Sequence, residues 1–202
     1  MLLNEKLAGY RLILASHSPR RRQLLAGCDL KFELAESYEV EEIYPHDLPA
    51  DEVPLYLAGL KSKGYPAQLG ERDILLTADT VVIVGGEILG KPSDADDAVR
   101  MLRKLSGRTH RVVTGVVLRS ARRTESFSVA SSVTFRPLDE EEIGYYVEHY
   151  RPMDKAGSYG IQGYGSMFVS HLDGDYFCVM GLPVCTLAGM LRDAGVRILG
   201  QA

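Results

Sequence analysis

The sequence is poor in cysteine, and this limits how the protein can be stabilised. Its 202 residues include three cysteines, Cys28, Cys178 and Cys185, and no two of them form a Cys-x-x-Cys pair. Neither a disulfide framework nor a zinc site built on paired cysteines is therefore indicated. We expect free thiols in a reducing compartment, and hence a cytoplasmic protein.

Long apolar runs and a large charge of one sign are also missing. Glu5 and Lys6 lie where a signal peptide would need its apolar stretch, and no segment approaches the ~20 apolar residues of a membrane span. The formal net charge is -4, from 23 basic and 27 acidic residues. Such a balance gives no general attraction for nucleic acid or a membrane surface, so we expect neither partner. Any bound anion must be held by a local basic cluster.

The length and composition are those of one globular domain. Hydrophobic residues make up 46% of the sequence and charged residues 25%, which provides one substantial core. No internal repeat or low-complexity linker divides the sequence. We therefore expect residues 1–202 to form a single domain.

Apolar runs, helical periodicity and turn residues predict alternating strands and helices. Strands are expected at residues 11–15, 31–35, 74–78, 111–119 and 126–135. Hairpins are expected to pair 81–84 with 87–89, and 167–171 with 176–179 through a turn at Asp173-Gly174. Helices are expected from Pro19, capped by Ser18, to Gly27, at 51–63, from a Ser93 cap to Gly107, at 139–149, and from Pro183 to about Ala194.

The segment SHSPRRR places Arg20, Arg21 and Arg22 in the first turn of a predicted helix. Cations there oppose the helix dipole at a cost of a few tenths of a kcal/mol or more each, so helix stability does not explain them. Free backbone N–H groups, the hydroxyls of Ser16 and Ser18 and forked guanidinium donors together would hold a phosphate. We favour this anion site over the alternative of a solvated basic helix end.

Asp79 and Thr80 are predicted to end a strand, where side chains project into the crevice at the carboxyl edge of an α/β sheet. Glu39, Glu41 and Glu42 lie in a loop after the second predicted strand and could approach the same edge. Mg²⁺ is held by one or two carboxylates together with substrate phosphates, which this set could supply. The alternatives are a turn-forming aspartate and an exposed acidic loop.

Other polar residues could complete a phosphate or base site. Lys91 leaves a rigid Gly-Lys-Pro turn, and Lys61 and Lys63 lie on a predicted helix, although for these two a solvated role is at least as plausible. Gln162 is the one amide of a glycine-rich stretch and could bind a base or a phosphate. No histidine pair has metal-ligand spacing, and no Walker or Gly-x-Ser-x-Gly motif occurs.

Five ordered segments make the chain, from about residue 11 to 191, resemble the Maf family of nucleoside triphosphate pyrophosphatases. They are LILASHSPRRRQLL, TADT, GKPSDADDAVRMLRKLSGRTHRVVTGV, PMDKAGSYGIQG and DGDYFCVMGLP. The resemblance implies an α/β fold with a mixed twisted sheet, flanking helices and two lobes around a central cleft, similar to inosine triphosphate pyrophosphatases. It implies hydrolysis of nucleoside triphosphates to monophosphate and pyrophosphate with a divalent cation, Mg²⁺ or Mn²⁺. It also leaves a homodimer open.

The resemblance also implies roles for single residues. Asp79 is the proton acceptor, and Glu42 belongs to the acidic catalytic group that holds the metal with Asp79. The combination of Arg20, Thr80 and Gln162 resembles the branch of the family that acts on dTTP and UTP. The substrate-binding residues are Ser16, Arg20, Arg21, Lys61, Thr80, Lys91 and Gln162.

The sequence departs from the family pattern at Ser62, where alanine is usual, and at Arg22, which extends the basic run. Three other functions stay open. The first is the same reaction on 7-methyl-GTP or a modified nucleotide. The second is non-catalytic nucleotide sensing in the control of cell division, against which Asp79 and Lys91 argue. The third is a nucleic-acid-binding module, against which the net negative charge and the lack of aromatic residues beside the arginines argue.

Overall fold

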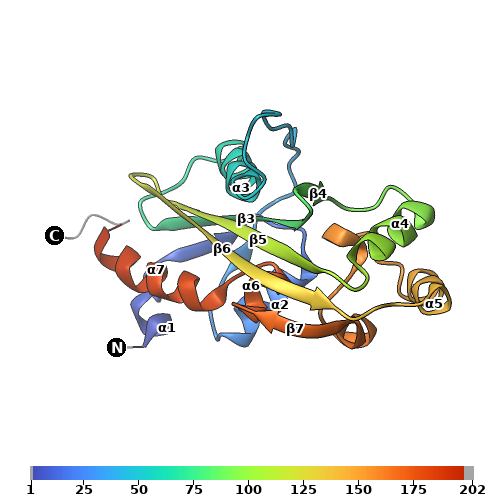
Figure 1. Cartoon of the computed structure of the whole chain (residues 1–202). Coiled ribbons are helices and arrows are strands. Elements are labelled where there is room, and N and C mark those ends of the chain that lie inside the picture. Colours follow the sequence, from blue (N-terminus) through green and yellow to red (C-terminus); the bar gives the residue numbers. More distant parts are fainter. Residues whose placement is uncertain (1, 198–202) are drawn as a thin grey trace.

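The computed structural model describes residues 2–197, and its centre is a seven-stranded mixed sheet in the order β2-β1-β3-β5-β6-β7, with β4 paired to β3 (Figure 1). β1 pairs in parallel with β2 and β3, and all other strand pairs are antiparallel. The strands are β1 (Arg11–Leu14), β2 (Glu33–Leu34), β3 (Asp73–Val84), β4 (Glu87–Leu89), β5 (Thr109–Arg119), β6 (Thr124–Phe135) and β7 (Val169–Asp173). The expected mixed α/β fold is confirmed.

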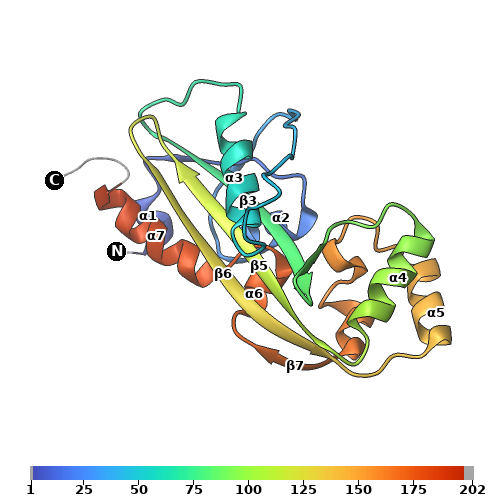
Figure 2. The ribbon, with the colours of Figure 1, turned by 45° about the horizontal axis from the view of Figure 1, so that its top comes forward.

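The helices lie on both faces of the sheet and beyond one end of it (Figures 1 and 2). On one face lies α3 (Val53–Lys63), and on the other lie α1 (Leu3–Lys6), α2 (Pro19–Gly27), α6 (Tyr176–Met180) and α7 (Val184–Arg197). Beyond the end of the sheet lie α4 (Ala95–Leu105) and α5 (Glu140–Tyr150), with the short 3₁₀ turns η1 (Ala156–Ser158) and η2 (Gly163–Phe168).

The hydrophobic core is divided in the same way. One large cluster joins the apolar faces of α4 and α5 to the adjoining ends of the sheet, with Leu102, Phe135 and Ile143 fully buried. A second cluster joins β1 to α2 and α7. Leu24 of α2 packs against both, so the first turns of α2 lie where the two clusters meet.

α3 is held unusually close to the sheet because β5 carries a glycine beneath it. A Cβ atom on Gly115 would lie 2.3 Å from the backbone nitrogen of Leu55 and 2.6 Å from the carbonyl carbon of Pro54. Only a residue without a side chain permits this approach of helix to strand. The position of α3 matters because Lys61 extends from it.

The predicted end of a strand at Asp79 is wrong. β3 continues without interruption from Asp73 to Val84, so Asp79 and Thr80 lie in its middle. The physical reason is β5, which pairs with β3 along its length and places Gly115 opposite Asp79 and Thr114 opposite Thr80. Backbone pairing with a distant strand overrides the local turn tendency of an Asp-Thr pair.

The second hairpin is also wrong in its second half, because residues Tyr176–Met180 form helix α6. Asp175 caps this helix by accepting a hydrogen bond from the backbone nitrogen of Phe177, and Gly181 ends it in a left-handed conformation at φ 104°. Both residues are typical of turns and of helix caps alike, and here they serve as caps. β7 pairs instead with β6.

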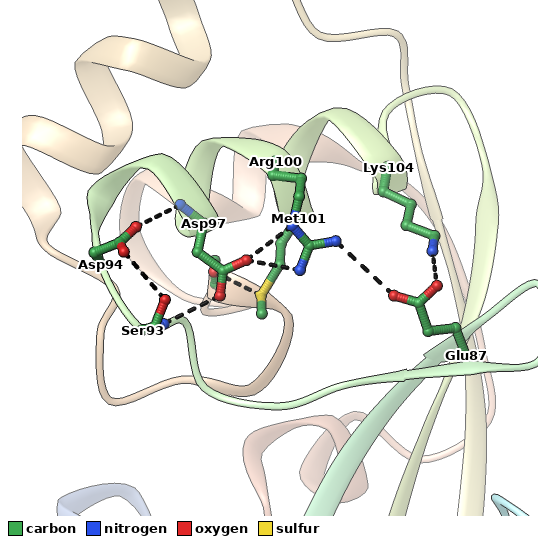
Figure 3. A network of polar contacts seen from close by, with 8 residues as sticks. Glu87, Ser93, Asp94, Asp97, Arg100, Met101 and Lys104 are labelled. Carbon is green, nitrogen blue, oxygen red and sulfur yellow. Dashed lines mark hydrogen bonds and ion pairs between the residues drawn. The ribbon is translucent and has the colours of Figure 1, made fainter.

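Two smaller corrections concern β2 and α4. The strand expected at residues 31–35 is reduced to β2, Glu33–Leu34, at the edge of the sheet. The cap of α4 is Asp94 and not Ser93, because the Asp94 carboxylate accepts a hydrogen bond of 2.8 Å from the backbone nitrogen of Asp97 (Figure 3). Glu87 of β4 forms ion pairs with Arg100 and Lys104, which fasten α4 to the hairpin (Figure 3). The other predicted elements are confirmed to within a few residues.

Candidate active site

A cleft of about 730 Å³ opens where β1 ends. The last residue of β1, Leu14, pairs with Leu76 of β3. Within residues 2–197, β3 then continues with no strand beside it on that side until Val82 pairs with Leu89. The middle of β3 is therefore an open edge of the sheet. The cleft follows this edge and has a volume typical of small-molecule sites.

The predicted site residues lie together around this cleft. It is lined by Ser16, Arg20, Arg21, Glu42, Lys61, Asp79, Thr80, Lys91 and Gln162. Glu39, Glu41 and Lys63 are not among the lining residues, so within residues 2–197 the acidic loop contributes Glu42 alone of its three candidate glutamates. Lys91 and Gln162 are exposed at the cleft.

On one face of β3 a lysine joins two carboxylates. Nζ of Lys61 lies 2.5 Å from Oδ1 of Asp79 and 3.1 Å from Oε1 of Glu42. The side chains of Asp79 and Lys61 are 14% and 21% exposed, whereas Glu42 is 50% exposed. The hydroxyl of Tyr38 donates a hydrogen bond of 2.7 Å to the carbonyl oxygen of Lys61, which ties the acidic loop to α3. The two carboxylates thus face a single position that already holds one positive charge.

On the other face of β3, Arg21 is fixed by three hydrogen bonds. Its Nε donates to the carbonyl oxygen of Gly181 at 2.7 Å, Nη1 to Oγ of Ser16 at 3.1 Å and Nη2 to Oγ1 of Thr80 at 3.0 Å. Burial lowers the pKa of Arg21, and the negative charge of Asp79 partly offsets that effect. Because three hydrogen bonds fix the guanidinium, its positive charge is held rigidly at the cleft, which suits the binding of an anion.

Ser16 and the start of α2 keep donors available. The oxygen of Ser16 accepts hydrogen bonds from Arg21 and from the backbone nitrogen of Ser18, at 3.3 Å, so its own proton can be donated to a ligand. Ser18 occupies the N-cap position, but its side chain makes no capping hydrogen bond. The N–H groups of the first turn of α2 are thus not satisfied by a cap, as an anion site at a helix start requires.

Asp154 and Lys155 also line the cleft, although the chemistry of the single residues predicted neither of them as part of the site. Arg20 donates to Asp154 at 3.0 Å, and Lys155 donates to Asp154 at 2.6 Å. Burial raises the pKa of Asp154, but the hydrogen bonds and positive charges of Lys155 and Arg20 together lower it by more. The segment PMDKAG, which contributes to the family resemblance, was the one signal that pointed to this pair.

A buried aromatic cluster adjoins the cleft through Tyr159. Tyr159 lines it, and its hydroxyl lies 2.7 Å from Nε2 of the buried His110, whose ring packs edge-on against Phe135. Burial lowers the pKa of His110 from 6.5 to about 4 and raises the pKa of Tyr159. Both side chains are therefore uncharged near neutral pH and add no positive charge to the cleft.

The carboxylate geometry bears on whether a divalent cation fits. Within residues 2–197 there is no group of three or more His, Cys, Asp or Glu side chains that could hold a metal on its own. Asp79 and Glu42, however, both face the Lys61 ammonium, so they can share a cation. Two carboxylates with phosphate oxygens from a substrate are a usual Mg²⁺ environment. The residues thus fit a metal that is bound jointly with substrate.

The chain resembles known proteins in both sequence and fold. The family described as Maf-like protein matches residues 11–194. A dTTP/UTP pyrophosphatase from Porphyromonas gingivalis is 50% identical over 194 residues, which are 95% of this chain and 98% of that protein. A dTTP/UTP pyrophosphatase from Phocaeicola vulgatus is 49% identical over 189 residues, covering 93% of this chain and 98% of that protein.

Among solved structures, a HAM1 protein from Coxiella burnetii has a TM-score of 0.52 and covers 92% of this chain and 100% of that chain, at 14% sequence identity. At that identity the likeness concerns the fold alone. Of the helices in the described part of the chain, none has the length and apolarity that crossing a membrane requires.

Proposed function

The chain belongs to the Maf family, and from that premise we propose that its cleft hydrolyses nucleoside triphosphates, dTTP and UTP in particular, to monophosphate and pyrophosphate. Proteins that bear the name dTTP/UTP pyrophosphatase match it at 49–50% identity over more than nine-tenths of its length. The observation that carries the proposal is spatial. One cleft contains both the Arg21 site and the carboxylates of Asp79 and Glu42.

The phosphates are assigned to the Arg21 side of the cleft. A triphosphate carries roughly four negative charges on its oxygens, which must be balanced before a nucleophile can attack the phosphorus. The rigid guanidinium of Arg21, the free hydroxyl proton of Ser16 and the start of α2 offer donors there. Lys91, which is exposed and has no ion pair among the described residues, adds a positive charge at the cleft.

The chemical step is assigned to Asp79. A water molecule attacks the α-phosphorus, an O–P bond forms, and the bond between that phosphorus and the bridging oxygen of the β-phosphate breaks to release pyrophosphate. Asp79 accepts the proton of the water, and Glu42 helps to orient it. Lys61 lies between these carboxylates and balances their charge. A divalent cation, Mg²⁺ or Mn²⁺, would be held by Asp79 and Glu42 and would supply further charge neutralisation for the polyphosphate.

Selection of the base is assigned to Arg20, Thr80 and Gln162. Arg20 is held at the cleft by Asp154, and Gln162 presents an exposed amide. An amide can both donate to and accept from the imide edge of thymine or uracil.

We also propose a single domain and a cytoplasmic location. Residues 1–202 act as one domain, as the match over residues 11–194 supports. The three cysteines, all free thiols, support a cytoplasmic location.

The test is to incubate the protein with a panel of triphosphates and Mg²⁺ or Mn²⁺ and to identify the products. Monophosphate and pyrophosphate are the products of the proposed reaction, whereas diphosphate and orthophosphate are those of cleavage at the γ-phosphate. The panel contains dTTP, UTP, 7-methyl-GTP and modified pyrimidine triphosphates. We expect pyrophosphate release to be fastest with dTTP and UTP. Release of orthophosphate, or nucleotide binding without turnover, would rule out the proposed reaction. Glu42→Gln should slow turnover, whereas Glu41→Gln, one residue away and outside the cleft, is the matched control.

A further inference from the structure

A chain of hydrogen bonds runs from Arg21 in the cleft to a residue buried beneath it. Thr114 of β5 lies opposite Thr80 of β3 and is fully buried, with 0% of its surface exposed. Its Oγ1 lies 2.8 Å from Oγ1 of Thr80 and 2.8 Å from the carbonyl oxygen of Cys178. Thr114 does not line the cleft, so any effect on a ligand must pass through the residues that it contacts, Thr80 above all.

The direction of each hydrogen bond in this chain follows from the number of protons. The carbonyl oxygen of Cys178 can only accept, so the single hydroxyl proton of Thr114 points to it. The contact between the two threonines must then use the proton of Thr80, and Thr114 accepts it. Thr80 has no proton left, and its oxygen accepts from Nη2 of Arg21. Thr80 therefore offers the cleft an acceptor and no donor.

The chain closes into a ring through the turn that follows α6. The backbone nitrogen of Gly181 donates to the same carbonyl of Cys178 at 2.9 Å, and the carbonyl oxygen of Gly181 accepts from Nε of Arg21 at 2.7 Å. The guanidinium is thus held at Nε by the backbone and at Nη2 by a hydroxyl whose orientation is set from below. A closed and fully satisfied network of this kind is rigid.

We propose that Thr114 is a positioning residue for the reaction: by accepting the proton of Thr80 it fixes the acceptor to which Arg21 donates, and so orients the guanidinium that binds phosphate. This rests on the proposed function in so far as Arg21 binds a triphosphate. Because Thr80 offers only an acceptor, we expect any contact between Thr80 and the substrate to involve a hydrogen-bond donor of the substrate, such as the imide N–H of thymine or uracil, and not a phosphate oxygen.

The ring of hydrogen bonds can be tested in the ligand-free protein by a measurement that does not depend on enzymatic activity. In Thr114→Val the hydroxyl of Thr80 loses its acceptor, while the carbonyl of Cys178 keeps the donor from Gly181. We expect nitrogen-15 NMR to show slow rotation of the Arg21 guanidinium about Nε–Cζ in the parent protein and in Thr114→Ser, and faster rotation in Thr114→Val. Arg21→Lys identifies the signal by removing it. Equal rotation rates in the three proteins would overturn the ring.

The link to the reaction is tested by steady-state kinetics with the triphosphate that the panel assay selects. We expect Thr114→Val to lower kcat/KM by roughly tenfold through a higher KM, the scale of one hydrogen bond to a charged group, and Thr114→Ser to restore it. Thr109→Val is the matched control, because it removes a hydroxyl from a similar pair, Thr109 with Thr134, on the same strand but outside the cleft.

The two measurements separate the failures. If Arg21 rotated faster in Thr114→Val but kcat/KM were unchanged, the positioning role would be overturned. If Thr109→Val lost as much kcat/KM as Thr114→Val, the effect would be a general one on the sheet and the positioning role would likewise be overturned. A parent protein without pyrophosphate release would instead refute the proposed function, and the NMR result would still decide whether the ring exists.

Discussion

The ammonium nitrogen of Lys61 lies 2.5 Å from Oδ1 of Asp79, so a lysine from α3 neutralises the carboxylate in the middle of β3. Arg21, from α2, contacts the next residue of the same strand, Thr80. Because successive side chains of a strand point to opposite faces, the two cations approach from opposite sides of the sheet. They reach one cleft because β1 ends early and leaves this part of β3 as an edge.

The first expectation concerns Asp79→Asn. The amide has the shape of the carboxylate but cannot accept a proton from water, so we expect turnover to fall at least ~10²-fold, the lower end of general-base catalysis. The measurement is pyrophosphate release at saturating substrate, with circular dichroism to show that the variant is folded. Near-parental turnover in a folded variant would refute the role of Asp79.

The second expectation concerns Lys61→Gln. Without the ammonium group, Asp79 and Glu42 would face each other uncompensated, so we expect the variant to bind Mn²⁺ more tightly than the parent protein in the absence of nucleotide, while turnover falls. Electron paramagnetic resonance of free Mn²⁺ measures the affinity without reference to activity. Lys63→Gln is the control, because Lys63 lies on the same helix but outside the cleft. Unchanged or weaker Mn²⁺ binding in Lys61→Gln would show that the lysine and the metal do not share a site.

Local patterns predicted the fold best where the periodicity was long. The apolar stripe of α4 and the alternation of β6 each specify an element and its buried face without reference to the rest of the chain. The continuity of β3 could not be predicted in this way, because it depends on pairing with β5, which lies far along the sequence. Helix α6 could not be predicted either, because its capping residues, Asp175 and Gly181, are equally typical of turns.

Local sequence likewise predicted only part of the candidate site. Three arginines and two serines at a helix start were sufficient to predict an anion site from local sequence, whereas Lys61 could not be told from a solvated lysine until α3 was placed beside β3. Which glutamate of the acidic loop reaches the cleft depends on the path of a loop. Thr114 could not have been found from the sequence, because its contact with Thr80 follows from the register of two strands.

The third expectation concerns the pH dependence of stability. The pKa of His110 falls from 6.5 to about 4 on burial, so between these pH values the unfolded chain binds a proton that the folded protein does not. The free energy of unfolding should therefore decrease as the pH falls from 6.5 to 4, with a contribution from His110 on the order of 3 kcal/mol. Urea unfolding at several pH values measures it, and His110→Gln should show a shallower decrease than the parent protein. Equal slopes would mean that His110 is protonated in the fold.

The fourth expectation compares two glycine substitutions with opposite signs. In Gly115→Ala the new Cβ would meet the backbone of Leu55 at 2.3 Å, and backbone atoms cannot move aside as a flexible side chain can. Overpacking of this kind costs about 1–3 kcal/mol and occasionally more, and we expect the upper end or beyond. Gly59 lies on α3 itself, and apart from its chain neighbours and the backbone of its own helix no described atom lies within 4 Å of an added Cβ. Gly59→Ala should therefore stabilise the helix by about 0.5–1 kcal/mol.

Gly115→Ala and Gly59→Ala should also differ in turnover. Gly115→Ala must push α3 away from the sheet, and this moves Lys61 from Asp79, so turnover should fall even at a temperature where the variant is fully folded. Gly59→Ala leaves the distance between helix and sheet unchanged and should keep parental turnover. Urea unfolding and pyrophosphate release on both variants provide the comparison. If Gly115→Ala kept parental stability and turnover, the tight contact of α3 with β5 would not be what places Lys61 in the cleft.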